Sequence, residues 1–208
     1  MEIKNIIFDL GGILLELYPQ RTINELEKLG IYRKIGEKAH SYSDEVFENF
    51  ETGKISASDF KTEIKNMTRG SVGEELLVDA WNAMICQFPQ KHVDLLRRLR
   101  DKGYKLFLLS NTNELHVKAF EDLFYNKFNF HIRSLFDRAL YSNEIGRRKP
   151  HKETFQFVLQ ALNIAPDKTL MIDDSPANIE GAKASGMCTL YIETNGDIFV
   201  PISKIINF

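Results

Sequence analysis

The sequence has little of what marks secreted or membrane-spanning proteins. Only two of its 208 residues are cysteines, and Cys86 and Cys188 lie far apart, without the paired spacing of a metal site. We expect both to be small core residues in a reducing compartment rather than a disulfide. No apolar run approaches the roughly 18 residues that span a bilayer, and no signal-like segment precedes the first apolar stretch. These absences predict a soluble, cytoplasmic protein.

An excess of charge of one sign is also missing. Lysine and arginine number 27 against 29 aspartates and glutamates, so the formal net charge is −2. Such a balance gives no electrostatic reason to expect nucleic acid or membrane as a partner. The short basic run at 97–100 is more typical of the solvated face of an amphipathic helix than of a phosphate-binding patch.

What the sequence does contain is a core-forming share of apolar residues, 43%, arranged in alternating patterns. A strand is expected at 3–8. After residue 88, strand patterns at 104–110, 137–142, 169–173 and 188–193 alternate with helical patterns at 91–102, 114–124, 152–162 and 176–185. This alternation predicts an α/β fold with a Rossmann-like, doubly wound parallel sheet covered by helices on both faces.

The segment 16–88 has a different character, because its apolar residues recur only with helical spacing. Gly30, Gly53 and Gly70 each follow such a stretch, as C-terminal caps do, and Ser56 or Ser58 is expected to cap a helix that begins near residue 59. We therefore predict a core domain made of 1–15 and 89–208, with 16–88 inserted as a helical cap domain.

Polar residues stand where four apolar stretches end or just beyond them. They are Asp9, Ser110 with Asn111, Lys149, and the pair Asp173 and Asp174. In an open parallel sheet, ligands gather at the carboxyl ends of the strands. These residues are therefore the candidates for a functional site.

Each acidic candidate has a functional and an ordinary explanation. Asp9 precedes Gly11 and Gly12, which would let the backbone turn sharply, so its carboxylate could serve as a nucleophile, a metal ligand or a plain turn residue. The adjacent carboxylates of Asp173 and Asp174 repel each other and suit Mg²⁺. The alternative is that Asp174 caps the next helix, a position that Ser175 also fits.

The neutral and basic candidates are weaker when taken singly. Ser110 and Asn111 are short donors that fit a phosphoryl or carbonyl oxygen, or they are an ordinary turn. Lys149 precedes a proline, which disfavours helix at the lysine; it could supply a fixed positive charge, or it is a surface residue.

Taken in order, these residues resemble the haloacid dehalogenase superfamily. The resemblance covers the whole chain, with 16–88 matching a helical cap inserted after the first strand. Within the superfamily, the DLGG and LLSNTNELH motifs, together with FETGKIS and DAWNAM in the cap, look most like the small phosphatases related to glucose-1-phosphate phosphatase.

The resemblance assigns a role to each candidate. Asp9 would be the nucleophile that forms an aspartyl-phosphate, Ser110 and the Asn111 backbone would bind the phosphoryl oxygens, and Lys149 would hold nucleophile and phosphate together. The implied magnesium ligands are Asp9, the main-chain oxygen of Gly11, Asp174, and Asp173 either directly or through water. Such a division of roles among these residues suits phosphoryl transfer, whose catalysis depends on positioning of the substrate and neutralisation of its charge.

One position departs from the superfamily pattern. Its phosphatases usually carry a second aspartate two residues after the nucleophile, as general acid and base, and here that residue is Gly11. Loss of this help typically costs about 10²–10⁴-fold in rate, and less with a good leaving group. Three residues are candidates to replace this aspartate by proximity in sequence alone, and none is favoured. They are Glu16, Asn113 and His116.

Three functions are compatible with these residues. The first is an enzyme, a Mg²⁺-dependent phosphatase of small phosphate monoesters with sugar phosphates favoured, acting as a monomer or homodimer on a phosphorylated metabolite. The second is a metal-independent 2-haloacid dehalogenase, and the third is a phospho-ligand-binding protein impaired in catalysis by Gly11. For the first, substrate selectivity is expected in cap residues 16–50.

Overall fold

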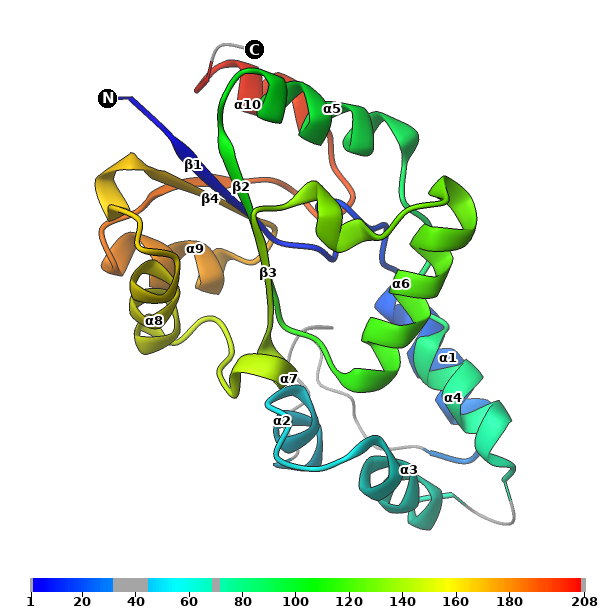
Figure 1. Cartoon of the computed structure of the whole chain (residues 1–208). Helices are drawn as coiled ribbons and strands as arrows, with labels where there is room; N and C mark the ends of the chain where they lie inside the picture. The colour runs from blue at the N-terminus through cyan, green and yellow to red at the C-terminus, as the bar shows by residue number, and fades with distance from the viewer. Residues whose placement is uncertain (1, 32–44, 69–71, 207–208) are drawn as a thin grey trace.

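The computed structural model of the protein describes residues 2–31, 45–68 and 72–206. Five strands form one sheet in the order β3-β2-β1-β4-β5, and each neighbouring pair is parallel. The strands are β1 (Asn5–Phe8), β2 (Lys105–Ser110), β3 (Arg138–Tyr141), β4 (Thr169–Asp173) and β5 (Cys188–Tyr191). The predicted α/β fold with a parallel sheet is confirmed (Figure 1).

Helices precede or follow every strand. They are α1 (Pro19–Lys28), α2 (Glu45–Glu51), α3 (Ala57–Asn66), α4 (Glu74–Asn82), α5 (Gln90–Asp101), α6 (Glu114–Phe128), α7 (Ser142–Ile145), α8 (Lys152–Leu162), α9 (Pro176–Ala184) and α10 (Phe199–Ser203), with 3₁₀ turns at Ile132–Leu135 and Pro166–Lys168. The helix predicted at 152–162 and the strand predicted at 169–173 have the observed bounds. The single-turn helix α7 and the short helix α10 were not predicted.

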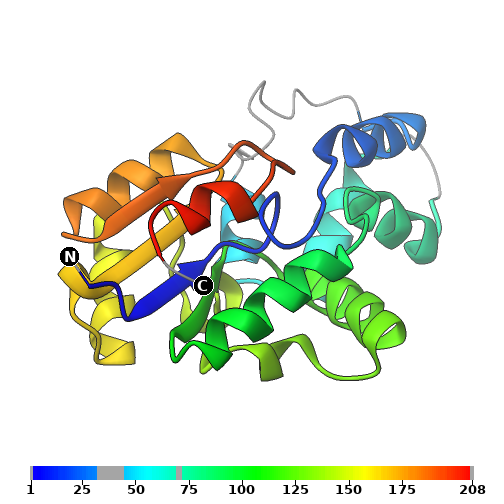
Figure 2. The ribbon, with the colours of Figure 1, turned by 90° about the horizontal axis from the view of Figure 1, so that it is seen from above.

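The sheet separates two apolar clusters because side chains alternate along each strand. On one face, Ile6 and Phe8 pack with residues of α5, α6 and α10. On the other, Ile7 packs with residues of α8 and α9. Viewed from above, α8 and α9 lie on the opposite side of the sheet from α5 and α10 (Figure 2). Helices therefore cover both faces, as the pattern of buried strands predicted.

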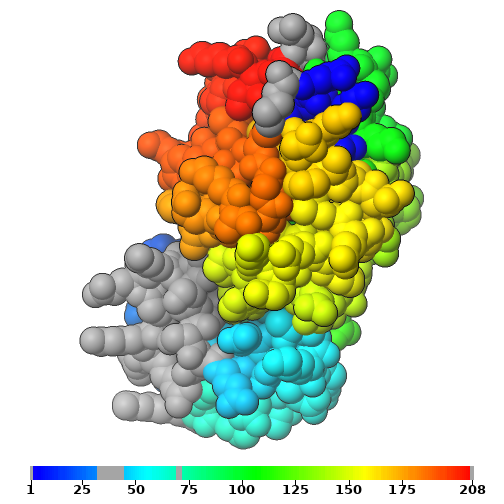
Figure 3. Space-filling model, turned by 90° about the vertical axis from the view of Figure 1, so that its left-hand side faces the viewer, coloured from blue at the N-terminus to red at the C-terminus, as the bar shows by residue number. Residues whose placement is uncertain are grey.

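Helices α1 to α4 enclose a third apolar cluster of their own, centred on aromatic side chains such as Phe50, Phe60 and Trp81. They gather at one end of the molecule, where α4 contacts α6 and α2 contacts α7 (Figure 1). The space-filling view shows the α2–α3 segment, in cyan, directly against the yellow-green segment of the core (Figure 3). The division of the chain into a core domain and a cap domain at 16–88 stays a prediction.

Local capping explains several helix ends. Ser56 caps α3 through a reciprocal pair of hydrogen bonds with Asp59. Gly30 and Gly53 end their helical stretches with φ of 84° and 67°, conformations that favour glycine, while Gly70 lies outside the described residues. The apolar C-terminal stretch, for which the sequence predicts no position, docks on the core through buried isoleucines at 198, 202 and 206.

The structure also bears on the expected absence of membrane spans and disulfides. Within the described ranges, no helix is both long enough and apolar enough to cross a bilayer. Cys86 and Cys188 are free thiols, and each is half-buried rather than fully enclosed in the core.

Candidate active site

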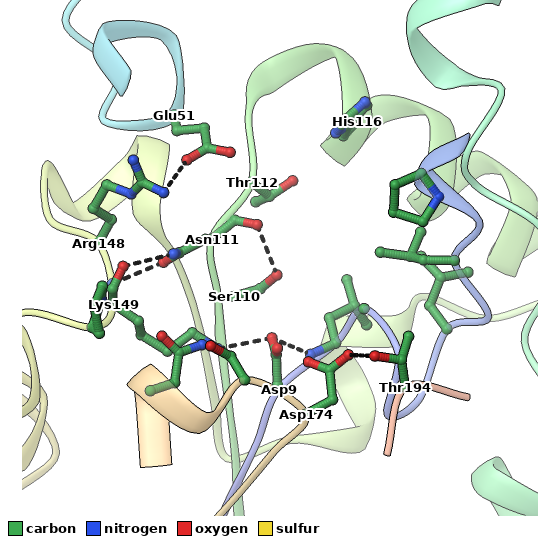
Figure 4. A pocket seen from close by; sticks show the side chains of 18 of the residues that line it. Asp9, Glu51, Ser110, Asn111, Thr112, His116, Arg148, Lys149, Asp174 and Thr194 are labelled. Atoms are coloured by element: carbon green, nitrogen blue, oxygen red, sulfur yellow. Dashed lines mark hydrogen bonds and ion pairs between the residues drawn. The ribbon is translucent and has the colours of Figure 1, made fainter. Parts of the chain in front are cut away.

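A cavity of about 650 Å³ lies at the carboxyl end of the sheet, and residues of α1 and α2, in the 16–88 segment, contribute to its wall. Asp9 lines it just after β1, Ser110 at the end of β2, and Asp174 just after β4. Lys149 reaches it from the loop before α8 (Figure 4). Because β1 lies between β2 and β4, this is the point where the strand order reverses, and such points gather ligands in open α/β sheets.

Asp9 is the buried carboxylate at the centre of this cavity. Its Oδ1 accepts hydrogen bonds from the Leu10 backbone N–H at 2.7 Å and from Lys149 Nζ at 2.9 Å. Burial raises the pKa of Asp9 to about 7, Lys149 opposes that rise, and Asp173 and Asp174 add to it. Burial is the largest of these causes, so the raised pKa reflects mainly the removal of the Asp9 carboxylate from water, with the two other carboxylates adding to it.

Lys149 bridges two carboxylates from a fully enclosed position. Only 1% of its side chain is exposed, and Nζ lies 2.9 Å from Asp9 and 2.7 Å from Asp173. Burial alone would lower its pKa, but Asp173 and Asp9 together raise the pKa of Lys149 above its usual value. The lysine therefore stays charged and is a fixed cation rather than a proton donor.

Asn111 holds the lysine in place through its side chain. Its Nδ2 donates to the Lys149 carbonyl and its Oδ1 accepts from the Lys149 N–H, each at 2.9 Å. Both polar atoms of the Asn111 side chain are thereby engaged, which the sequence did not reveal. For a ligand, this strand end offers the Ser110 hydroxyl and the Asn111 backbone. The hydroxyl is available because its contact with the Asn111 carbonyl is long, at 3.4 Å.

The tandem aspartates have different surroundings. Asp173 is fully buried and accepts from Lys149, from Asn178 Nδ2 and from the Ser175 N–H. Asp174 Oδ2 accepts from the Thr194 hydroxyl at 2.6 Å. Ser175 does stand at the N-cap of α9, but its side chain makes no capping hydrogen bond. The predicted place of Ser175 at the cap is therefore confirmed, and its backbone N–H donates to Asp173.

The three carboxylates fit a divalent cation. Asp9, Asp173 and Asp174 each offer an oxygen, and these oxygens lie within 4.8 Å of one another. Hard oxygen donors suit Mg²⁺, and Lys149 balances only one of the three negative charges. Because protein donors already engage both oxygens of Asp173, this residue suits contact through water better than direct ligation.

Two glycines shape the loop beside Asp9. Gly12 has φ of 75°, and a Cβ there would overlap the Asp174 carboxylate, so only glycine lets the backbone approach so closely. A Cβ on Gly11 would overlap the tip of the Leu17 side chain. Asn195 fixes Leu17 by bonding both its N–H and its carbonyl. An apolar side chain therefore crowds the place where the second aspartate of the superfamily would begin.

His116 lines the cavity but is not suited to replace that aspartate. Asn113 Nδ2 donates to its Nδ1, and its Nε2 contacts the Trp81 carbonyl at 3.1 Å, which fixes the proton on Nε2. Burial lowers the pKa of His116 to about 4. Both ring nitrogens are thus occupied, Nδ1 by the N-cap residue of its own helix and Nε2 by a carbonyl of α4. Glu16 hydrogen-bonds to Gln87 and is not among the cavity residues.

Several residues of this cavity were not expected from the sequence. Thr194 follows β5 and could have been found by applying the strand-end rule to that strand as well. Leu17 and Glu51 could not, because their place in the wall depends on how α1 and α2 pack over the sheet. Arg148, the neighbour of Lys149, carries no sequence signal that assigns it a role.

Comparison with known proteins shows full-length similarity to phosphatases. The chain is 26% identical, over 99% of both sequences, to the D-ribitol-5-phosphate phosphatase of Bacteroides thetaiotaomicron. A haloacid dehalogenase family enzyme from the same organism, crystallised with magnesium and inorganic phosphate, superposes with a TM-score of 0.85 at 31% identity, covering 95% of this chain and 98% of that one.

A protein from Porphyromonas gingivalis, described as a predicted haloacid dehalogenase-like family hydrolase, superposes with a TM-score of 0.87 at 28% identity over the whole of both chains. The sequence pattern of the haloacid dehalogenase-like hydrolases itself matches residues 3–186. A match of that extent confirms the resemblance drawn from the strand-end residues: the chain belongs to the haloacid dehalogenase-like hydrolases.

Proposed function

We propose that the protein is a magnesium-dependent phosphatase of small phosphate monoesters, with phosphorylated sugars and polyols as its substrate class. The observation that carries the proposal is the meeting of Asp9, Asp173 and Asp174 with a single buried lysine in one cavity. That arrangement leaves unbalanced negative charge for a cation. The activity of the ribitol phosphate phosphatase and the magnesium and phosphate bound to the solved relative support the same chemistry.

In this proposal, Asp9 attacks the phosphorus atom of the substrate. Its Oδ2 receives no hydrogen bond from the described residues, while Lys149 and the Leu10 N–H hold Oδ1. The phosphorus–ester oxygen bond breaks as the aspartyl-phosphate forms, and water then releases phosphate and regenerates the carboxylate. Ser110 and the Asn111 N–H would hold the phosphoryl oxygens, and Lys149 would balance their charge.

Magnesium would be held by Asp9, Asp174 and the main-chain oxygen of Gly11, with Asp173 reached through water. It supplies charge neutralisation at the phosphoryl group. Thr194 would orient Asp174 for this role. The helical segment 16–88 would act as a cap that excludes water from the cavity.

The leaving group distinguishes substrates within this class. Without an acid at Gly11, an anomeric sugar oxygen leaves more readily than a primary alcohol. That argument, together with the motif at 108–116, supports a place near the glucose-1-phosphate phosphatases, whereas the full-length relative supports a polyol phosphate. The substrate panel must contain both.

The test is phosphate release from p-nitrophenyl phosphate, glucose 1-phosphate and D-ribitol 5-phosphate, with and without Mg²⁺. We expect magnesium-dependent turnover that Asp9→Asn abolishes. Asp122→Asn, which alters an exposed pair with Lys118 on α6, should leave turnover unchanged.

Other outcomes would support other functions. Metal-independent chloride release from 2-chloropropionate would indicate a dehalogenase. Binding of phosphate esters without turnover of any of them would indicate a binding protein.

A further inference from the structure

An ion pair in the cavity wall joins the two parts of the chain. Glu51 is the last residue of α2, and Arg148 precedes the buried Lys149. Arg148 Nη2 lies 3.1 Å from Glu51 Oε2, and each side chain is 15% exposed. Both residues line the cavity that holds Asp9. Neither of them has a role in the proposed attack on phosphorus.

The pair leaves polar atoms unsatisfied. Within the described chain, Glu51 Oε2 accepts no hydrogen bond of good geometry and Arg148 Nε donates none, although both atoms are buried. Burial raises the pKa of Glu51, and Arg148 opposes the rise. Each side chain nevertheless keeps 15% of its surface exposed, and both residues line the cavity. Because the wall is charged here, polar groups of a ligand would be more favourable beside it than apolar groups.

Both residues sit on well-fixed backbone. Thr154 donates to the Arg148 carbonyl at 2.8 Å, and Asn111 clamps the next residue, Lys149. On the other side, Gly53 packs so closely that a Cβ there would overlap the Asn143 carbonyl. The end of α2 therefore lies directly against the core, and Glu51 has little freedom to move away from Arg148.

The pair lies away from the reacting bond. In Figure 4, Ser110 and Asn111 separate Glu51 and Arg148 from Asp9. A phosphate held at Asp9 would direct the rest of the substrate along the cavity, and only its far end would reach the pair. This placement suits recognition of the substrate and not proton transfer to its leaving group.

We propose that Glu51 and Arg148 bind hydroxyl groups at the end of the substrate remote from the phosphate, and thereby select a polyhydroxylated chain. The inference rests on the proposed phosphatase function. A hydroxyl donates and accepts, so neighbouring hydroxyls can donate to the Glu51 carboxylate and accept from the exposed part of the Arg148 guanidinium. An apolar chain would cover this ion pair without offering a hydrogen bond to either side chain. A second phosphate at this place would be attracted by the Arg148 guanidinium but repelled by the Glu51 carboxylate, so the pair does not suit a bisphosphate. Glu51 lies just outside the 16–50 segment in which selectivity was expected.

The test compares two substrates with the same primary leaving group, D-ribitol 5-phosphate and n-pentyl phosphate. The wild type should prefer the ribitol ester in kcat/KM. Glu51→Ala and Arg148→Ala should each reduce that preference about tenfold or more, mainly through KM, because each removes a partner of a buried hydroxyl. Glu51→Gln, which keeps an acceptor oxygen, should recover part of the preference.

A matched control separates recognition from docking of the cap. Glu114 also spans the boundary between the helical segment and the core, since its carboxylate accepts from the Ala57 N–H at 3.2 Å, but it is not a cavity residue. Glu114→Gln should leave the substrate preference unchanged. Equal losses on both substrates in the Glu51 and Arg148 variants would show that the pair only holds the cap, and would overturn the inference.

Failure of the inference and failure of the proposed function are distinguishable. A wild type that hydrolyses p-nitrophenyl phosphate with magnesium but does not prefer the ribitol ester would overturn the inference alone. A wild type that hydrolyses no phosphate ester would overturn both.

Discussion

Replacing Lys149 with methionine removes the cation that bridges Asp9 and Asp173. The methionine has a similar length, so the change deletes charge with little change in volume. With 1% of the lysine exposed and contacts of 2.9 and 2.7 Å, both carboxylates would be left buried without their shared partner. Breaking a buried pair in this way typically costs about 3–5 kcal/mol of the free energy of unfolding.

The measurement is urea unfolding of both proteins in EDTA, followed by the fluorescence of Trp81 and by circular dichroism. Trp81 is the only tryptophan of the chain and stacks on His116, so it reports on contact between α4 and α6. Added Mg²⁺ should stabilise Lys149→Met more than the wild type, because a bound cation would replace the missing positive charge. Phosphatase activity should be lost in both conditions.

The control is Lys183→Met, which removes an exposed ion pair with Glu180 on α9. It should change the free energy of unfolding by less than about 0.5 kcal/mol. A Lys149→Met protein within about 1 kcal/mol of the wild type in EDTA would refute the view that this lysine neutralises two buried carboxylates.

The remaining predictions concern the residues around this centre. Thr194→Val should weaken Mg²⁺ binding about 10–100-fold by calorimetry, because Asp174 loses the hydroxyl that orients it; unchanged affinity would contradict that role. His116 should destabilise the fold as pH falls from 6.5 to about 4, because the unfolded chain takes up a proton that the folded chain does not. The loss of unfolding free energy should reach about 3 kcal/mol. In His116→Leu the unfolding free energy should fall less over this pH range than in the wild type, and an equal fall in both proteins would contradict the prediction. Gly11→Asp combined with Leu17→Ala, which clears the overlapping side chain, should raise turnover of n-pentyl phosphate relative to p-nitrophenyl phosphate about tenfold or more; an unchanged ratio would show that another group already supplies the proton.

Much of the fold could be predicted because its signals are local. Helical and strand periodicity located α8 and β4 with their observed bounds, and the capping residues Ser56 and Gly53 mark real helix ends. The shared edge of the sheet then followed from parallel strand order. For that reason Asp9 and Asp174, separated by most of the chain, were expected together, and their oxygens do lie within 4.8 Å of each other.

What could not be predicted depends on contacts between distant segments. Nothing near Asn111 indicates that its side chain clamps Lys149 instead of facing a ligand. Leu17 crowds Gly11 because Asn195, 178 residues later, holds its backbone. The hydrogen bond from Thr194 to Asp174 likewise requires β5 to lie beside β4.

The most direct test of the proposed chemistry is a crystal structure of the protein with Mg²⁺ and beryllium trifluoride, a mimic of a phosphoryl group on aspartate. We expect beryllium on an oxygen of Asp9, its fluorides near Ser110 and Lys149, and magnesium contacting Asp9 and Asp174. Beryllium bound elsewhere, or magnesium absent from these carboxylates at saturating concentration, would contradict the account.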